Sequence, residues 1–172
     1  MNVDFKLFDW EEIFGTVKAT EGLKRKQTRG LRTEIQEIAT AKYSNNQFEY
    51  VGMREDGHDY LDCHGIFWED KGQGNMFQKT TGKTAPFTLK NWQGNSKSTV
   101  HKTFDYILVK DTKKMCVGWS TWDAVYKNID SKDAQVYSHI DYDDLYVIEL
   151  LVISKQKSDV SISLQKLIED II

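Results

Sequence analysis

Two carboxylates and one lysine that follow each other closely, Asp59, Glu69 and Lys71, are the side chains best suited to chemistry. Two adjacent carboxylates repel each other unless a cation lies between them, and Mg²⁺ is commonly held by one or two carboxylates together with substrate phosphate. Such a metal polarises a phosphodiester and lowers the pKa of a bound water. A neighbouring lysine can position or deprotonate that water and neutralise developing charge. The three residues therefore predict metal-assisted hydrolysis of a phosphodiester.

A hairpin is needed to bring these side chains together. Gly65 tolerates the backbone angles of a tight turn, so residues 63–65 are expected to connect two strands. Asp59 would then lie opposite Glu69, with Cβ atoms roughly 4.5–5.5 Å apart if directly paired. Because side chains alternate between the faces of a strand, Lys71 would share the face of Glu69. By the same parity, Asp62 and Asp70 would point to the other face.

The residues that follow the hairpin have an unusual charge distribution. Residues 72–104 contain five lysines and no Asp or Glu, whereas residues 1–71 carry 10 basic and 14 acidic side chains and residues 105–172 carry 8 and 12. The net charge of −3 therefore hides a local excess of positive charge. A polyanion lying alongside would explain this pattern, and a solvated lysine-bearing loop is the alternative. Beside phosphodiester chemistry, the pattern favours nucleic acid.

The hairpin segment resembles a known family. Asp59, nine intervening residues and Glu69-Asp70-Lys71 after the apolar run Ile66-Phe67-Trp68 are similar to the PD-(D/E)XK nuclease signature. The likeness is greatest to small type II restriction endonucleases, whose catalytic hairpin has the same Asp-to-Glu separation. It is carried by residues 54–71, and His58 stands where the signature has proline.

The resemblance implies a type II site-specific deoxyribonuclease that is cytoplasmic, uses Mg²⁺ and cuts double-stranded DNA as a homodimer. Asp59 and Glu69 would be the metal ligands, and both would act with Lys71 in catalysis. Members often add a third acid from the preceding helix, for which Glu34 and Glu37 are the candidates. The implied fold is α/β, a restriction-endonuclease-like mixed β-sheet flanked by helices, in one nuclease domain over residues 1–172.

The acid-free stretch is the expected recognition segment, because Asn and Gln can pair with adenine and Lys with guanine or phosphate. The residues expected to contact DNA are Gln73, Asn75, Gln78, Lys79, Lys83, Lys90, Asn91, Gln93, Asn95 and Lys97.

Periodicity and turn residues predict the other elements. Ser120 is expected to cap a helix, with Asp123 reaching back to it. Predicted helices cover residues 5–18, 31–43 and 158–171, and predicted strands cover residues 47–54, 58–63, 66–71, 104–110, 115–119 and 145–153, with a turn at 111–114 and a short extended segment at 86–90.

The remaining composition sets broad limits. The chain has 172 residues, 40% of them apolar, which suits one domain with a real core. Only two cysteines occur, Cys63 and Cys116, so a reduced, cytoplasmic protein is expected. The sequence contains no stretch of transmembrane length. The apolar N-terminal helices are the favoured dimer surface, and the C-terminal helix is the other candidate.

Three alternatives stay open at this stage. The chain could be a structure-specific or repair nuclease of the same fold, or a DNA-binding module without catalysis. The carboxylates could also belong to a surface hairpin with an ordinary Glu–Lys pair. A zinc site at His58, Cys63 and His64 is disfavoured because no second Cys/His cluster lies nearby in the sequence.

Overall fold

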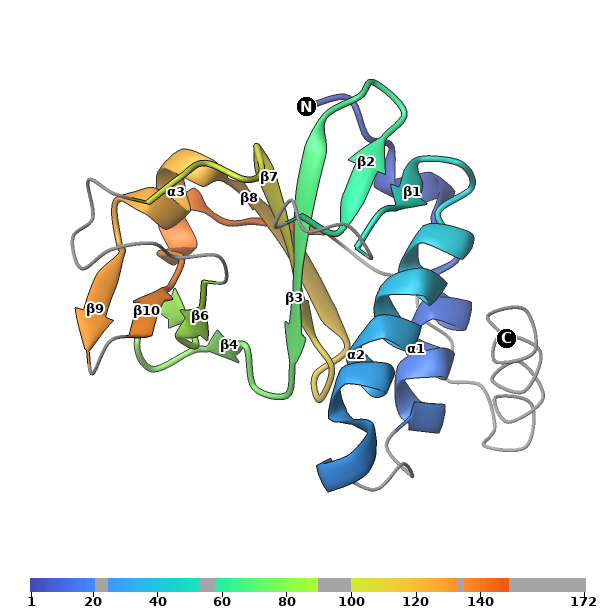
Figure 1. Ribbon diagram of the computed structural model, residues 1–172, viewed down its shortest axis with the longest axis horizontal. Helices are drawn as coiled ribbons and strands as arrows, with labels where there is room; N and C mark the ends of the chain where they lie inside the picture. The colour runs from blue at the N-terminus through green and yellow to red at the C-terminus, as the bar shows by residue number, and fades with distance from the viewer. Residues whose placement is uncertain (21–24, 53–57, 90–99, 133–134, 149–172) are drawn as a thin grey trace. The chain divides into compact units, whose positions relative to one another are not determined.

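The computed structural model describes residues 1–20, 25–52, 58–89, 100–132 and 135–148, with the backbone alone for residues 25–31. These residues form a mixed α/β structure (Figure 1), and its main sheet has six strands in the order β1-β2-β3-β7-β8-β11. The mixed sheet confirms the expected α/β class. The chain divides into two compact units, of which one holds Met1–Val51 and Tyr60–Gly65 and the other holds Gly52–Asp59 and Ile66–Glu149.

The first unit begins with three helices: the 3-10 helix η1 (Phe5–Leu7), α1 (Trp10–Thr20) and α2 (Arg25–Lys42). The prediction of one helix over residues 5–18 was wrong, because the helix is interrupted at Phe8 and Asp9. The Asp9 carboxylate accepts the backbone N–H of Glu12 at 3.2 Å, which satisfies a donor of the first helical turn and starts α1 there. Helix α2 begins six residues before its predicted start at residue 31.

The large apolar side chains near the N-terminus pack inside the first unit. The Phe8 ring lies 4.9 Å from that of Trp10 and 5.3 Å from that of Phe48, while Ile13 and Phe14 are fully buried. Their number had favoured a subunit contact at this surface. The structure accounts for them within the unit, so they no longer support a dimer interface there.

Two short strands complete the described part of this unit, β1 (Phe48–Tyr50) and β2 (Tyr60–Asp62). They pair antiparallel, with Phe48 opposite Asp62 and Tyr50 opposite Tyr60. After β2 the chain turns, and the Gly65 N–H donates to the Asp62 carbonyl at 3.0 Å. Gly65 has φ 78°, a left-handed angle that favours glycine, as the sequence predicted for this turn.

The second unit contains the strands β3 (Phe67–Gln73), β7 (Tyr106–Asp111), β8 (Cys116–Thr121) and β11 (Tyr146–Ile148). Strand β3 pairs parallel with β7, whereas β7 with β8 and β8 with β11 are antiparallel. The predicted turn at residues 111–114 is confirmed. The buried Asp111 carboxylate accepts the backbone N–H groups of Lys113 and Lys114 at 3.1 and 2.8 Å.

Short strands also occur where mostly loop was expected. The acid-free stretch contains β4 (Phe77–Gln78), β5 (Lys83–Thr84) and β6 (Phe87–Thr88), the last within the predicted extended segment 86–90. Strand β6 pairs with β10 (Gln135–Ser138), which pairs with β9 (Asp130–Lys132). Neither β9 nor β10 was predicted, because their sequences are too short and polar to show strand periodicity.

The helix that follows β8 is α3 (Trp122–Tyr126), and the 3-10 helix η3 (Tyr142–Asp144) precedes β11. The predicted cap of α3 was wrong by one residue. Thr121 is the N-cap and accepts the Ala124 N–H, whereas the Ser120 hydroxyl donates to the Asp144 carbonyl at 2.7 Å. The predicted helix 158–171 and the end of the predicted strand 145–153 lie outside the described residues.

In the described ranges, no helix is both long and apolar enough to cross a membrane.

Candidate active site

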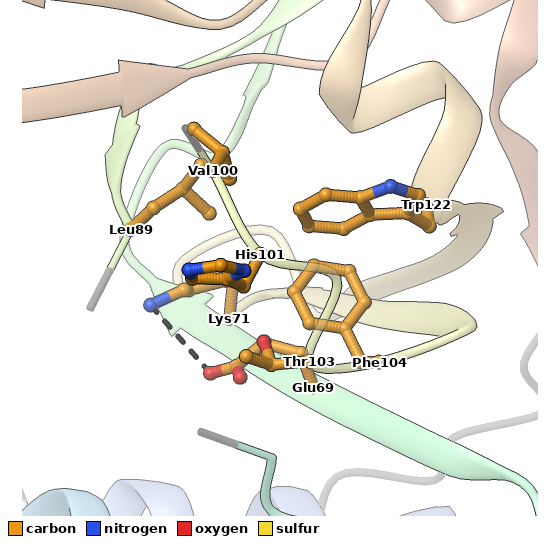
Figure 2. A pocket seen from close by; sticks show the side chains of 8 residues that line it. All are labelled: Glu69, Lys71, Leu89, Val100, His101, Thr103, Phe104 and Trp122. Atoms are coloured by element: carbon orange, nitrogen blue, oxygen red, sulfur yellow. Dashed lines mark ion pairs between the residues drawn. The ribbon is translucent and has the colours of Figure 1, made fainter. Parts of the chain in front are cut away.

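Strand β3 carries two of the predicted catalytic side chains on one face. Glu69 and Lys71 both line a hollow in the second unit (Figure 2), and the Lys71 Nζ lies 3.7 Å from the Glu69 Oε1. Their side chains retain 13% and 18% of their exposure, so they are shielded but reachable. On the parallel strand β7, Ile107 and Val109 lie beside Glu69 and Lys71 in register and are fully buried. The charged pair therefore stands at the edge of an apolar core.

Asp59 lies against β3 at the level of Glu69. Its backbone N–H donates to the Trp68 carbonyl at 2.9 Å, and its Oδ2 accepts the Asp70 N–H at 2.7 Å. These two bonds reach the residues on either side of Glu69. Asp59 is half-buried and is not among the side chains that line the hollow. One oxygen is held by the backbone, and a carboxylate has further lone pairs for another ligand.

His58, which precedes Asp59, is held by an aromatic contact. Its ring stacks on Phe67 with centroids 4.1 Å apart, and only 6% of the residue is exposed. The residue that stands in place of the signature proline is therefore fixed by packing.

The other face of β3 has a different role. The Asp70 Oδ2 lies 3.0 Å from the Lys110 Nζ of β7, and both side chains are almost fully buried. A buried pair of this kind is structural, because each charge would be costly without the other. Asp62 is also buried and accepts the backbone N–H of His64 at 2.8 Å. Because side chains alternate between the faces of β3, Asp70 lies on the face opposite to that of Glu69 and Lys71, as predicted.

The rest of the hollow wall, beyond Glu69 and Lys71, was missed by sequence reasoning. It consists of Leu89, Val100, His101, Thr103, Phe104 and Trp122. His101 and Lys102 are exposed and Thr103 is half-buried, and the spacing of two between the histidine and the threonine was the signal available in the sequence. It could not be used, because only the folded chain brings residues 100–104 to Glu69 and Lys71.

The wall segment is anchored through Asp105. The Asp105 N–H donates to the Phe67 carbonyl, and the Trp122 N–H donates to the Asp105 carbonyl, each at 2.9 Å. Lys102 pairs with the Asp105 carboxylate at 2.9 Å, and this hydrogen bond raises the pKa of Lys102. Phe104 packs edge-on against Trp122 with ring centroids 5.0 Å apart. These contacts connect the segment to β3 and to the start of α3.

Half of the predicted DNA-contacting residues lie within the described part of the chain. Gln73, Asn75 and Lys79 are exposed, and Gln78 and Lys83 are half-buried on β4 and β5. The other five, Lys90, Asn91, Gln93, Asn95 and Lys97, lie outside the described residues.

The hairpin of β4 and β5 is tied to the end of β7. The Phe77 N–H donates to the Asp111 Oδ2 at 2.9 Å, and the Lys114 ammonium donates to the Phe77 carbonyl. Asp111 thus fixes both the turn after β7 and the position of the hairpin.

The candidates for a third acid, Glu34 and Glu37, are half-buried on α2 and belong to the first unit. Among the described residues, His, Cys, Asp and Glu side chains form no group of three or more that could hold a metal ion. The donor set of Asp59 and Glu69 still fits Mg²⁺, which keeps several waters and is commonly bound through one or two carboxylates and a phosphate. It does not fit a structural zinc site, which takes four protein ligands rich in Cys and His.

No protein-family model matches the chain, and no curated protein matches it closely enough in sequence to count as a relative.

Proposed function

We propose that this protein is a Mg²⁺-dependent endonuclease that hydrolyses phosphodiester bonds of double-stranded DNA. The observation that carries the proposal is the arrangement on β3. Glu69 and Lys71 share one face of the strand, with the Lys71 Nζ 3.7 Å from the Glu69 Oε1. Hydrogen bonds between Asp59 and the β3 backbone hold the Asp59 carboxylate at the level of Glu69.

Each of the three side chains has a distinct role in the proposed reaction. Asp59 and Glu69 would hold Mg²⁺, which would supply Lewis-acid stabilisation of the phosphate and a more acidic water. Lys71 orients the attacking water and balances the charge that develops on the phosphate oxygens. The Glu69 carboxylate keeps the Lys71 ammonium at the edge of the core. The apolar residues behind this pair exclude water, which strengthens electrostatic interactions there.

Charge and exposure support DNA as the polymer. The stretch without acids follows β3 directly, and within it Gln73, Asn75 and Lys79 are exposed. Lysines supply sequence-independent attraction to phosphates, while amide side chains can read base edges. From the resemblance of residues 54–71 we further propose cleavage at a specific DNA sequence, a restriction-endonuclease-like fold and a cytoplasmic homodimer, with Glu34 or Glu37 as an assisting acid.

Substrate comparison tests this function. Wild-type protein is incubated with linear duplex, branched DNA and single-stranded DNA, each with Mg²⁺ or with EDTA. Cutting of the linear duplex in Mg²⁺ alone supports the proposal. Cutting confined to branched DNA makes the chain a structure-specific nuclease instead, and binding without cutting makes it a DNA-binding module.

A further inference from the structure

His101 and Thr103 are the polar residues of the hollow wall besides Glu69 and Lys71 (Figure 2). The rest of that wall is apolar: Leu89, Val100, Phe104 and Trp122. Neither His101 nor Thr103 has a hydrogen-bond partner within the described ranges of the chain. The Thr103 hydroxyl can donate a hydrogen bond. The His101 imidazole can donate one from whichever ring nitrogen carries the proton.

Three donors therefore meet around one small space. The Lys71 ammonium, the imidazole and the hydroxyl all line the hollow, and so does the Glu69 carboxylate, which is an acceptor. The hollow holds about 280 Å³ of space free of protein atoms, part of it open to solvent. The site thus suits a single anionic group presented by a larger molecule better than an enclosed small ligand.

The anchoring of the wall supports a binding role. Asp105 anchors the end of the segment by backbone bonds to Phe67 and Trp122, two residues after Thr103 and four residues after His101. Prepositioned donors lose little entropy on binding, which is what a substrate-holding site requires.

The geometry points to His101 and Thr103 as substrate-contacting residues that, with Lys71, hold the non-bridging oxygens of one DNA phosphodiester. The inference rests on the proposed function and extends it, because the resemblance and the β3 motif assign neither residue. His101 and Thr103 act as hydrogen-bond donors, and no covalent bond to them forms.

Variant kinetics form the first arm of the test. His101→Ala and Thr103→Val should each lower kcat/KM for duplex DNA by roughly 10- to 100-fold, the effect of losing a hydrogen bond to a charged group. His101→Gln and Thr103→Ser keep a donor and should recover much of the loss. His64→Gln, at an exposed turn of the first unit and not among the residues that line the hollow, serves as the control. Unchanged kcat/KM in both His101→Ala and Thr103→Val would overturn the inference.

The second arm needs no nuclease activity. The chain has four histidines, His58, His64, His101 and His139, so their imidazole NMR signals can be assigned by single substitutions. With EDTA present, at constant pH and ionic strength, inorganic phosphate should shift the His101 signal, and Lys71→Met should abolish the shift. Duplex DNA should displace the phosphate.

The two arms separate the inference from the function it rests on. A phosphate response at His101 in a protein that never cuts DNA leaves the anion site standing and removes the nuclease proposal. Efficient cutting of DNA, with no phosphate-induced shift of the His101 signal and no loss of kcat/KM in the variants, removes the anion site and leaves the nuclease proposal standing.

Discussion

Glu69, Lys71 and Asp59 differ in how tightly the fold holds them, and this determines what their substitution reports. Glu69 and Lys71 project into the hollow, and substitution there removes charge without opening the core. Asp59 is bonded to the β3 backbone through its carboxylate. An Asp59→Asn variant keeps an oxygen for the Asp70 N–H and so isolates the loss of charge, whereas Asp59→Ala also removes the bond.

The first prediction concerns catalysis. The substitutions Glu69→Gln, Lys71→Met and Asp59→Asn should each lower the rate of DNA cleavage by about 10²- to 10⁴-fold. This is the usual contribution of one positioned acid–base group. Their thermal unfolding midpoints should stay close to that of the wild type. Glu49→Gln, an exposed carboxylate on β1, is the matched control. Full activity in Glu69→Gln or Lys71→Met would remove β3 from the active site.

At the scale of elements, side chains that alternate between the two faces of β3 place the candidate catalytic residues on one face and a structural ion pair on the other. Its face with Glu69 and Lys71 lines the hollow, and its other face carries Asp70 in a buried pair with Lys110 of β7. Because Asp70 points away from the proposed metal, its side chain would be expected to tolerate substitution. The structure changes that expectation, since substitution of Asp70 breaks its buried ion pair with Lys110.

The second prediction follows from this pair. Lys110→Met should lower the free energy of unfolding by about 3–5 kcal/mol, the usual cost of breaking a buried ion pair by removing one of its members. The double variant Asp70→Leu, Lys110→Met should recover part of that loss, because no buried charge remains. Urea denaturation of both variants measures this, with exposed Lys113→Ala as control. Equal stability of Lys110→Met and wild type would show that the pair is not structural.

The hairpin of β4 and β5 gives the third prediction. If it lies along DNA, Lys79→Ala and Lys83→Ala should weaken binding and lower the slope of log affinity against log salt by about one unit per lost phosphate contact. Lys79 is exposed and should show the clearer effect. Fluorescence anisotropy across a salt series provides the data. A slope that stays the same in both variants would place DNA elsewhere.

Local patterns predicted the parts of the fold that depend on neighbouring residues. Alternation along residues 66–71 gave the faces of β3, and the turn at Asp111 followed from residue type. The break before α1 and the cap at Thr121 depend on which of several similar side chains reaches a backbone N–H. The wall of His101 and Thr103 depends on contacts between segments far apart in the sequence, so no local pattern contained it.

At the scale of the whole molecule, the net charge of −3 is a poor guide to its partners. The acidic residues lie outside the stretch 72–104, and that stretch belongs to the unit that contains β3. A local positive region can therefore attract DNA even though the overall charge is negative.

The fourth prediction concerns assembly. Each chain offers one proposed catalytic centre, and cutting both strands of a duplex at one site most simply takes two centres related by two-fold symmetry. Light scattering at micromolar concentration should then give twice the 20.0 kDa mass of one chain. A strict monomer that nicks one strand at a time would refute the dimer and leave the catalytic residues unaffected.

Digestion of a circular plasmid of known sequence tests the central claim most directly. With Mg²⁺, the wild type should give a fixed set of discrete fragments, while EDTA or the Glu69→Gln substitution should leave the plasmid intact. The account is contradicted if the wild type leaves the plasmid uncut in Mg²⁺, or if Glu69→Gln produces the same fragments at the same rate.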